Sequence, residues 1–215
     1  MGRGCGAEAV TDCAVLILAA GSSSRMRGGD KLLEQVAGKP LLRVVLERAV
    51  AAATGPVLCT VPGPDHPRRT CLEGLDVTPV IVTDPSEGMG ASIRAGVAAL
   101  PEGVSAVMIL PADLPDLTTD DLGRMMIAWH DTPDAILRAV DCVGQQGHPV
   151  IFPAALFPDL LRCRGDTGAR DLLRAHAAQM VTVALPDRHA TTDLDTPEAW
   201  AQWRAQRCQT GRPED

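Results

Sequence analysis

Two cations follow a run of small residues near the N-terminus. The segment LAAGSSSRMRGGDK, residues 18–31, holds Gly21 and three serines and then Arg25 and Lys31. Backbone N–H groups of small, flexible residues can surround phosphate oxygens, and Arg and Lys add positive charge to the same loop. A flexible turn with solvated charges would explain the Gly/Ser run alone. Because both cations come directly after an apolar run, the spacing favours a phosphate-binding loop, although the G-x-x-x-x-G-K-[ST] pattern of a Walker loop is absent.

Carboxylates stand at two further points of the chain. Asp113 lies in LPADLPDL, residues 110–117, between an apolar run and the rigid Pro115. A carboxylate at the end of a strand is a suitable hard ligand for Mg²⁺. Asp193 and Asp195 stand two residues apart in DLDTPEAW, and only one of them need face a site. Thr196 suits the N-cap of the following helix better than either aspartate does.

The remaining polar candidates give weaker signals. The charged stretch RGDTGARDLLRAH, residues 164–176, offers Asp166 and Arg170 as substrate contacts, or it is a solvated entry to a helix. The GMG at 88–90 lacks the third glycine of a dinucleotide fingerprint. The five histidines have no metal-ligand spacing, and no G-x-S-x-G elbow indicates a serine hydrolase.

Apolar patterns predict the elements that must position these residues. Continuous apolar runs predict buried strands, and apolar positions on one helical face predict helices. The predicted strands cover residues 13–20, 56–61, 77–82, 106–110, 135–140, 149–152 and 180–185. The predicted helices cover residues 40–55, 91–100, 118–130, 154–162, 168–177 and 196–207. This alternation indicates an α/β fold with a single doubly wound, mostly parallel sheet, which binds ligands at the carboxyl ends of its strands.

Composition excludes several classes of protein. A net charge of −7 and an aromatic fraction of 2% argue against a nucleic-acid partner. Seven cysteines without a C-x-x-C pair indicate reduced thiols rather than a zinc or disulfide framework. The run at 13–20 is too short to span a bilayer, and Glu8 and Asp12 precede it where a signal peptide would be positive. We therefore expect a cytoplasmic protein without a membrane partner, with a loose extension at 1–12, one domain at 13–207 and a polar tail at 208–215.

Seven segments together resemble the MobA-like nucleotidyltransferases. The segment at 18–31 is similar to the L-A-[AG]-G-x-S-x-R-M-x(n)-K signature of that family, with an extra residue before Lys31. The other six are GKPLL (38–42), EGMGASIRAG (87–96), LPADLP (110–115), GHPVIF (147–152), GDTGAR (165–170) and DLDTPEAW (193–200). The set spans about residues 13–205 and most resembles the branch of CTP:molybdenum cofactor cytidylyltransferases. Ala20, where guanylyl members read Gly, and Ala112, where many members also have Gly, are small departures.

The resemblance implies a Rossmann-like nucleotidyltransferase fold and a reaction. CMP would pass from CTP to the terminal phosphate of molybdopterin bearing molybdenum, with release of pyrophosphate. The implied catalytic residues are Arg25, Lys31 and Asp113. The implied nucleotide-binding residues are Leu18, Ala19, Ala20, Gly21, Ser22, Ser23, Arg25, Lys31 and Ser92. The implied acceptor-binding residues are Gly147, His148, Pro149, Asp166, Gly168 and Arg170. Asp113 would hold Mg²⁺ together with Asp195 or Asp193, and a recipient molybdoenzyme or its chaperone is an implied partner.

Three alternatives to this reading stay open from the sequence. Within the class, the donor could be GTP, or the acceptor a sugar or polyol phosphate. An NAD(P)-dependent oxidoreductase would share the sheet, but the chain lacks the full glycine fingerprint and the acidic residue after it. A non-catalytic module that hands a cofactor to a molybdoenzyme is disfavoured, because Arg25, Lys31 and Asp113 are all present.

Overall fold

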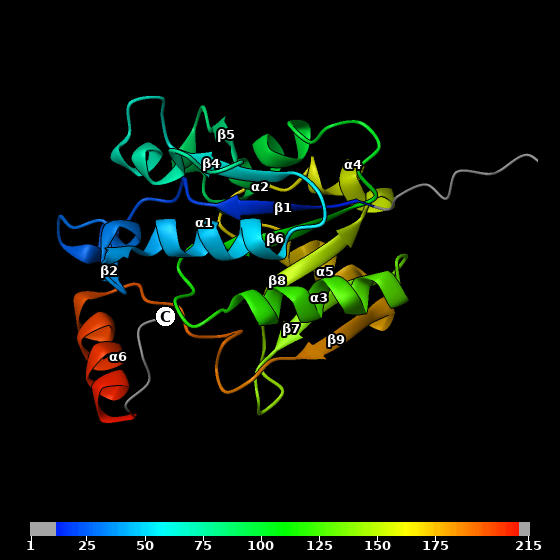
Figure 1. Cartoon of the computed structure of the whole chain (residues 1–215). Coiled ribbons are helices and arrows are strands. Elements are labelled where there is room, and N and C mark those ends of the chain that lie inside the picture. The colour runs from blue at the N-terminus through cyan, green and yellow to red at the C-terminus, as the bar shows by residue number, and fades with distance from the viewer. Residues whose placement is uncertain (1–11, 211–215) are drawn as a thin grey trace, which may run out of the picture.

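A seven-stranded sheet forms the centre of the molecule (Figure 1). The computed structural model describes residues 12–210, with the side chains of residues 209 and 210 left out. The strand order is β5-β4-β1-β6-β8-β7-β9, and β8 alone runs antiparallel to its two neighbours. The strands are β1 (Cys13–Leu18), β4 (Val57–Val61), β5 (Thr78–Ile81), β6 (Ala106–Pro111), β7 (Ile136–Val140), β8 (Gln146–Pro153) and β9 (Met180–Ala184). The predicted α/β class and the mostly parallel sheet are confirmed.

Helices cover both faces of this sheet. Alternate residues of the central strand β1 are therefore buried on opposite sides of the sheet. In β1, Val15 and Ile17 pack in one apolar cluster with α1 (Leu41–Ala52) and α3 (Thr119–Asp131). Ala14 and Leu16 pack in the other cluster with α2 (Met89–Ala98), α4 (Phe157–Leu160) and α5 (Arg170–Ala175). The continuous apolar run thus predicted a strand buried on both faces correctly.

Side-chain caps fix where two of the helices begin. Thr118 and Asp121 form a capping box at the start of α3, as the Thr/Asp chemistry at 118 predicted. Thr196 accepts a hydrogen bond of 3.2 Å from the N–H of Ala199 and begins α6 (Pro197–Thr210). The last helix therefore continues three residues beyond its predicted end at 207, into the segment expected as a tail. The expected extension lies outside the described residues except for Asp12.

The last helix ties two distant loops together. Arg204 contacts Glu34 at 2.7 Å, and Arg207 contacts Asp116 at 3.0 Å. The indole N–H of Trp203 also donates to Asp116 at 2.9 Å. Trp200 is only 1% exposed and meets Trp203 edge-on, so both tryptophans are packing anchors as expected.

Several short elements differ from the prediction. β1 ends at Leu18 rather than at residue 20, because the next N–H, that of Ala19, turns to Thr60 on β4. An unpredicted hairpin pairs β2 (Gln35–Val36) with β3 (Lys39–Pro40). Six 3₁₀ helices were also not predicted as such: η1 (Ser24–Met26), η2 (Lys31–Leu33), η3 (Pro67–Leu72), η4 (Pro85–Glu87), η5 (Ala154–Leu156) and η6 (Ala177–Gln179). None of the helices within residues 12–210 combines the length and the apolar character needed to cross a bilayer.

Candidate active site

A cavity of about 680 Å³ opens beside the carboxyl ends of β1 and β6. This is the sheet edge where the strand order predicts a ligand site. Most of the site residues expected from the sequence line it, although they come from five separate segments of the chain. The expected residues in its lining are Leu18, Gly21, Ser22, Arg25, Lys31, Ser92, Asp113, Asp166, Arg170, Asp193 and Asp195.

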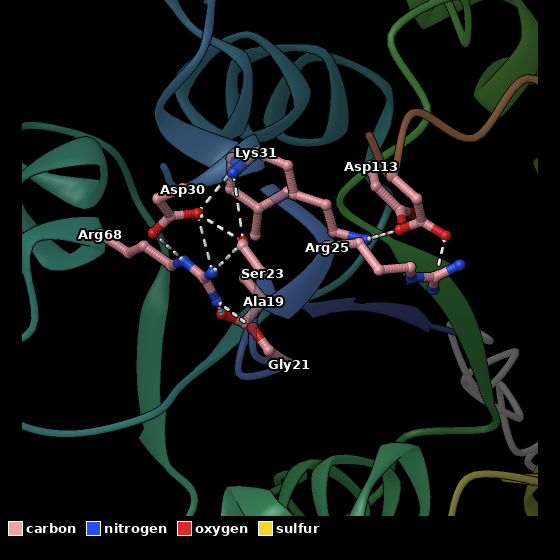
Figure 2. A network of polar contacts seen from close by, with 10 residues as sticks. Ala19, Gly21, Ser23, Arg25, Asp30, Lys31, Arg68 and Asp113 are labelled. Atoms are coloured by element: carbon pink, nitrogen blue, oxygen red, sulfur yellow. Dashed lines mark hydrogen bonds and ion pairs between the residues drawn. The ribbon is translucent and has the colours of Figure 1, made fainter. Parts of the chain in front are cut away.

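Lys31 is the centre of the charged group in this cavity. Its Nζ lies 2.6 Å from Asp113 Oδ2 and 2.6 Å from Asp195 Oδ1. The other oxygen of Asp195, Oδ2, lies 2.7 Å from Nη2 of Arg25. Figure 2 shows the side chains of Lys31 and Arg25 reaching toward Asp113 from the same loop. Two cations and two carboxylates therefore meet at one point, although Asp195 stands far from Lys31 in sequence.

The fold brings the two carboxylates to Lys31 through backbone contacts. Asp113 follows β6, and the N–H of Ala112 bonds to the carbonyl of Leu18 at the end of β1. The N–H of Leu194 bonds to the carbonyl of Asp113 at 3.4 Å, which brings the segment before α6 to the site. Asp195 then faces Lys31, whereas Asp193 is exposed at the cavity rim. Both aspartates line the cavity, and Asp195 is the one that contacts Lys31 and Arg25.

Electrostatics keep Lys31 charged in spite of its burial. Burial disfavours the ammonium, but the charges and hydrogen bonds of Asp113 and Asp195 outweigh it and raise the pKa of Lys31 above its ordinary value. The Lys31 side chain is 15% exposed, while Arg25 is 69% exposed. Lys31 is therefore a buried charge within the site, and Arg25 is an exposed charge that pairs with Asp195.

The two carboxylates fit a hard divalent cation. Mg²⁺ is commonly held by one or two carboxylates and completes its shell with water and phosphate oxygens. Asp113 and Asp195 already converge on one positive centre, the ammonium of Lys31. Within residues 12–210, no group of three or more His, Cys, Asp or Glu side chains is placed to hold a metal ion. The donor set suits a cation that is shared with a phosphate ligand rather than one enclosed by protein.

In the loop after β1, several backbone N–H groups lack an acceptor among residues 12–210, whereas two backbone carbonyls accept hydrogen bonds from a side chain. No residue within 12–210 accepts a hydrogen bond from the N–H of Ala20, Gly21 or Ser22. The carbonyls of Ala19 and Gly21 instead accept from Arg68, at 2.6 and 2.7 Å. Sequence reasoning missed Arg68, because Arg69 beside it has the same type and the same context. The one available signal was that both arginines follow a buried strand.

The other residues assigned to the nucleotide lie around this loop. Ser92 is 4% exposed at the start of α2 and lines the main cavity. Ala19 is buried and donates to Thr60, so its side chain does not face the cavity. Ala20 and Ser23 line a second hollow of about 650 Å³ on the other side of the loop. The sides of this hollow include Pro62, His66, Arg68 and Pro85.

The residues assigned to the acceptor divide into lining and supporting groups. Asp166 and Arg170 line both the main cavity and a smaller one of about 120 Å³ next to it, which His148 also lines. Gly147 has no room for a side chain, since a Cβ atom there would lie 1.9 Å from the carbonyl oxygen of Ala190. Pro149 and Gly168 are buried, and neither they nor Gly147 line either of these two cavities.

His148 is the most unusual of the acceptor-side residues. Its backbone N–H bonds to the carbonyl of Ala190 at 2.9 Å, which fixes the strand there. Its ring Nδ1 is buried without a hydrogen-bond partner among the described residues. Burial, followed by the charge of Arg138, lowers the pKa of His148 to about 4. The ring is therefore neutral at physiological pH and has an unused polar atom beside the smaller cavity.

Comparisons with known proteins show the family of the chain. Residues 15–181 match the model of the MobA-like NTP transferase domain. The molybdenum cofactor guanylyltransferase of Rhodopseudomonas palustris is 32% identical over 199 residues, which cover 86% of this chain and 89% of that protein. A protein of Rhodopirellula baltica named probable molybdenum cofactor guanylyltransferase is 28% identical over 188 residues, covering 84% of this chain and 88% of that one.

A solved structure extends the likeness to three dimensions. The crystal structure of Rv0371c from Mycobacterium tuberculosis has a TM-score of 0.76 to this chain at 25% identity, covering 90% of this chain and 98% of that one. A further structure of Rv0371c is a complex with manganese. Since the family model covers more than half of the chain, including the loop at 18–31 and Asp113, the chain belongs to the MobA-like NTP transferase family and is a nucleotidyltransferase.

Proposed function

We propose that this protein transfers CMP from CTP to the terminal phosphate of molybdopterin bearing molybdenum, with release of pyrophosphate. The observation that supports it best is the cluster of Lys31 with Asp113 and Asp195. Next to this cluster, the N–H groups of Ala20, Gly21 and Ser22 have no acceptor among residues 12–210. Phosphoryl-type transfer depends on positioning and on charge neutralisation rather than on covalent chemistry by the protein. The two cations of this site can neutralise charge, and its carboxylates and backbone N–H groups can position the reacting phosphates.

The loop and its two cations would bind the triphosphate of the donor. The N–H groups of Gly21 and Ser22 would donate to phosphate oxygens. Lys31 would neutralise charge at the reacting phosphate, and the exposed Arg25 would follow the leaving pyrophosphate. The acceptor phosphate is already ionised at neutral pH, so no general base is required at the attacking oxygen.

Asp113 and Asp195 would hold Mg²⁺. The exposed Asp193 is the alternative to Asp195 as the second ligand. When bound, this ion supplies positive charge that stabilises the charge developing on the α-phosphate. The manganese complex of Rv0371c supports a divalent cation in this fold. The role of the chain itself is to bring the two carboxylates, from β6 and from the segment before α6, to one point.

The acceptor would enter from the side of β8 and α5. Asp166 and Arg170 stand where the main cavity meets the smaller one, so they can contact a ligand that extends from the α-phosphate toward His148. Arg170 would pair with the acceptor phosphate, and His148 would meet a polar group of the acceptor. The product would then pass to a recipient molybdoenzyme or its chaperone.

The choice of CTP rests on the hollow beside Ala20. Ala20 is 1% exposed, and its methyl group occupies space that a glycine would leave to the base. A smaller hollow favours a pyrimidine over a purine, although one methyl group contributes only about 1–3 kcal/mol of discrimination. GTP is the second candidate donor, because two similar proteins are named molybdenum cofactor guanylyltransferases.

Two experiments test the proposal. Mass spectrometry of the products is expected to reveal a cytosine dinucleotide after incubation with CTP, Mg²⁺ and molybdenum-bearing molybdopterin, and none with sugar or polyol phosphates as acceptors. CTP with Mg²⁺ should raise the Tm more than GTP does, because ligand binding stabilises the folded state by mass action. Equal shifts with CTP, GTP and ATP would contradict the cytidylyl assignment, and a guanine dinucleotide product would replace it with the guanylyl one.

A further inference from the structure

Arg68 occupies an unusual place for an arginine. It comes from η3, which follows β4, and it is only 2% exposed. A guanidinium carries five N–H donors, and each of them has an acceptor here. Figure 2 shows the group inserted behind the loop, away from Asp113. The five contacts are Nη1 to the carbonyls of Ala19 (2.6 Å) and Gly21 (2.7 Å), Nη2 to Ser23 Oγ (3.0 Å) and Asp30 Oδ1 (2.8 Å), and Nε to Asp30 Oδ2 (2.8 Å).

These contacts decide which way the loop peptides face. In a planar trans peptide the carbonyl of one residue and the N–H of the next point in opposite directions. Since the carbonyls of Ala19 and Gly21 point to Arg68, the N–H groups of Ala20 and Ser22 point away from it. Gly21 and Ser22 line the main cavity, and they also border the second hollow, which Arg68 lines. Arg68 therefore holds the carbonyl side of the loop and leaves the N–H groups of Ala20 and Ser22 for a triphosphate.

The same network reaches Lys31 through its neighbour in sequence. Ser23 Oγ donates to Asp30 Oδ1 at 3.0 Å and accepts from the N–H of Lys31 at 3.1 Å. Asp30 Oδ1 also accepts from the N–H of Leu32 at 3.0 Å and caps η2, the short helix that begins with Lys31. The two ends of the loop, at 19–23 and at 30–32, are thus joined to one buried guanidinium.

Arg68 contributes geometry to the site rather than net charge. Asp30 binds it through both carboxylate oxygens, so the two charges compensate each other. Burial alone would raise the pKa of Asp30, but the hydrogen bonds and the charge of Arg68 outweigh burial and lower this pKa below its ordinary value. The positive charge available to a ligand therefore comes from Arg25 and Lys31.

We propose that Arg68 is the positioning residue of the phosphate-binding loop, which it holds with the N–H groups toward the ligand and with Lys31 directed at Asp113 and Asp195. This inference rests on the proposed function only in that the loop binds a triphosphate. It does not depend on the base of the donor or on the identity of the acceptor.

The test compares two arginines of the same region. Arg68→Met removes the contacts to the loop, and Arg68→Lys keeps a charge but loses the fork. The matched control is Arg43→Met, because Arg43 bonds to the carbonyls of Cys71 and Glu73 at the other side of the η3 segment and does not touch the loop. Inorganic tripolyphosphate with Mg²⁺ serves as the probe, since it has the phosphates of the donor without its base.

Calorimetry should then separate positioning from general loosening. Arg68→Met is expected to weaken tripolyphosphate binding by about tenfold or more, as a lost set of charge-assisted hydrogen bonds would. Arg68→Lys should lie between it and the wild type, and Arg43→Met should stay within about twofold. In turnover assays, Arg68→Met should raise the KM for the nucleotide and leave the KM for the acceptor unchanged.

Hydrogen exchange gives an independent reading on the ligand-free protein. In Arg68→Met, peptides from residues 19–31 should exchange faster, while peptides from β1 and β6 keep their protection. If Arg68→Met does not fold, Asp30→Asn replaces it, and the double variant with Arg68→Lys should show a coupling between the two sites. Binding of tripolyphosphate to Arg68→Met, or to Asp30→Asn in its place, within about twofold of wild type would overturn the proposal. So would a wild-type protein that does not bind tripolyphosphate.

The results that would contradict the proposed function differ from those that would contradict the role of Arg68. If tripolyphosphate binds and depends on Arg68, but CTP binds no better than ATP, the role of Arg68 stands and the cytidylyl assignment falls.

Discussion

The nucleotide side and the acceptor side of the cavity are built in opposite ways. On the nucleotide side, every N–H group of Arg68 has an acceptor, and Lys31 is held between two carboxylates. On the acceptor side, Arg170 is exposed, and Nδ1 of His148 is buried with no partner among the described residues. On the nucleotide side the charged side chains are thus already held in place, and the N–H groups of Ala20, Gly21 and Ser22 are left for a ligand. On the acceptor side a buried side-chain atom, Nδ1 of His148, is left for a ligand instead.

This difference follows from what each side has to bind. A triphosphate has the same shape and charge in every nucleotide, so a rigid loop binds it without losing freedom on binding. A buried polar group without a partner costs about 1–3 kcal/mol, which a ligand can recover by bonding to it. We therefore expect substitutions on the nucleotide side to lower turnover, and changes on the acceptor side to alter acceptor affinity and the pH dependence of stability.

The strongest test of the nucleotide side is Asp113→Asn. The change keeps the size of the side chain and removes the charge that would hold Mg²⁺, so kcat should fall by about a hundredfold or more. The Tm should stay within a few degrees of wild type, because Asp113 lies beyond the end of β6. Asp120→Asn on the exposed start of α3 is the matched control. Retention of most of the activity would mean that the metal is held elsewhere.

Removal of the two loop cations should have the next largest effect. Lys31→Ala and Arg25→Ala are each expected to lower kcat/KM by about tenfold to a few hundredfold, as the loss of charge-assisted bonds to phosphate would. Lys31 should be the more sensitive, since it is the more buried. Arg43 pairs with Glu47 on α1 at 2.8 Å, so Arg43→Ala should leave kcat/KM almost unchanged. Steady-state kinetics in which Arg43→Ala matched Lys31→Ala would show that the loop is not the triphosphate site.

The pH dependence of stability tests the unpartnered histidine. The pKa of His148 is about 4 in the folded protein and about 6.5 in the unfolded chain. Between these values the unfolded chain takes up a proton that the folded protein refuses, so the free energy of unfolding falls as the pH is lowered from about 6.5 toward 4. At pH 5 this loss is on the order of 2 kcal/mol. His148→Gln should flatten the decline in Tm between pH 7 and 5, whereas the exposed His130→Gln should not. Parallel declines in both variants would mean that His148 binds protons normally.

The smallest expected effect concerns the acceptor. Arg170→Ala should raise the KM for the acceptor by about tenfold, which corresponds to the loss of one charge-assisted bond. The KM for CTP should not change, because Arg170 lies where the main cavity meets the smaller one that His148 lines. Arg174→Ala, on the same helix and paired only at the surface with Asp171, is the control. Equal changes in both KM values would show that the two sides are not separate.

Patterns of local origin predicted most of the scaffold. The apolar run of β1 predicted its burial on both faces, and Thr118 predicted the start of α3. The loop with Lys31 and the strand end with Asp113 were expected at one sheet edge, and Lys31 Nζ contacts Asp113 there at 2.6 Å. These features depend on residues close in sequence or on a parallel topology, so the chain itself reveals them.

Features that depend on distant partners escaped prediction. Arg68 and Arg69 are neighbours of one type, and only the packed loop buries the first and exposes the second. The choice of Asp195 over Asp193 depends on the bond from Leu194 to Asp113. The hairpin of β2 and β3 is too short to show a period, and its turn includes Ala37 at a φ of 53°, which an alanine rarely adopts. β8 begins at Gln146, before the predicted start at 149, and contains Pro149 within the strand.

Asp195 is synthesised long after Lys31, and this order has a consequence for when the site becomes complete. The bond from Lys31 to Asp195 spans 164 residues, and α6, which holds that segment against Glu34 and Asp116, follows it. At about 5–20 residues per second, a ribosome needs roughly 10–30 s between the two residues. During this interval a nascent chain can pair β1, β4, β5 and β6 and form the loop, yet it has only one of the two carboxylates. Nucleotidyl transfer should therefore begin only after Asp195 has been synthesised, so that a chain stalled before Asp195 would bind the nucleotide triphosphate without transferring its nucleotidyl group.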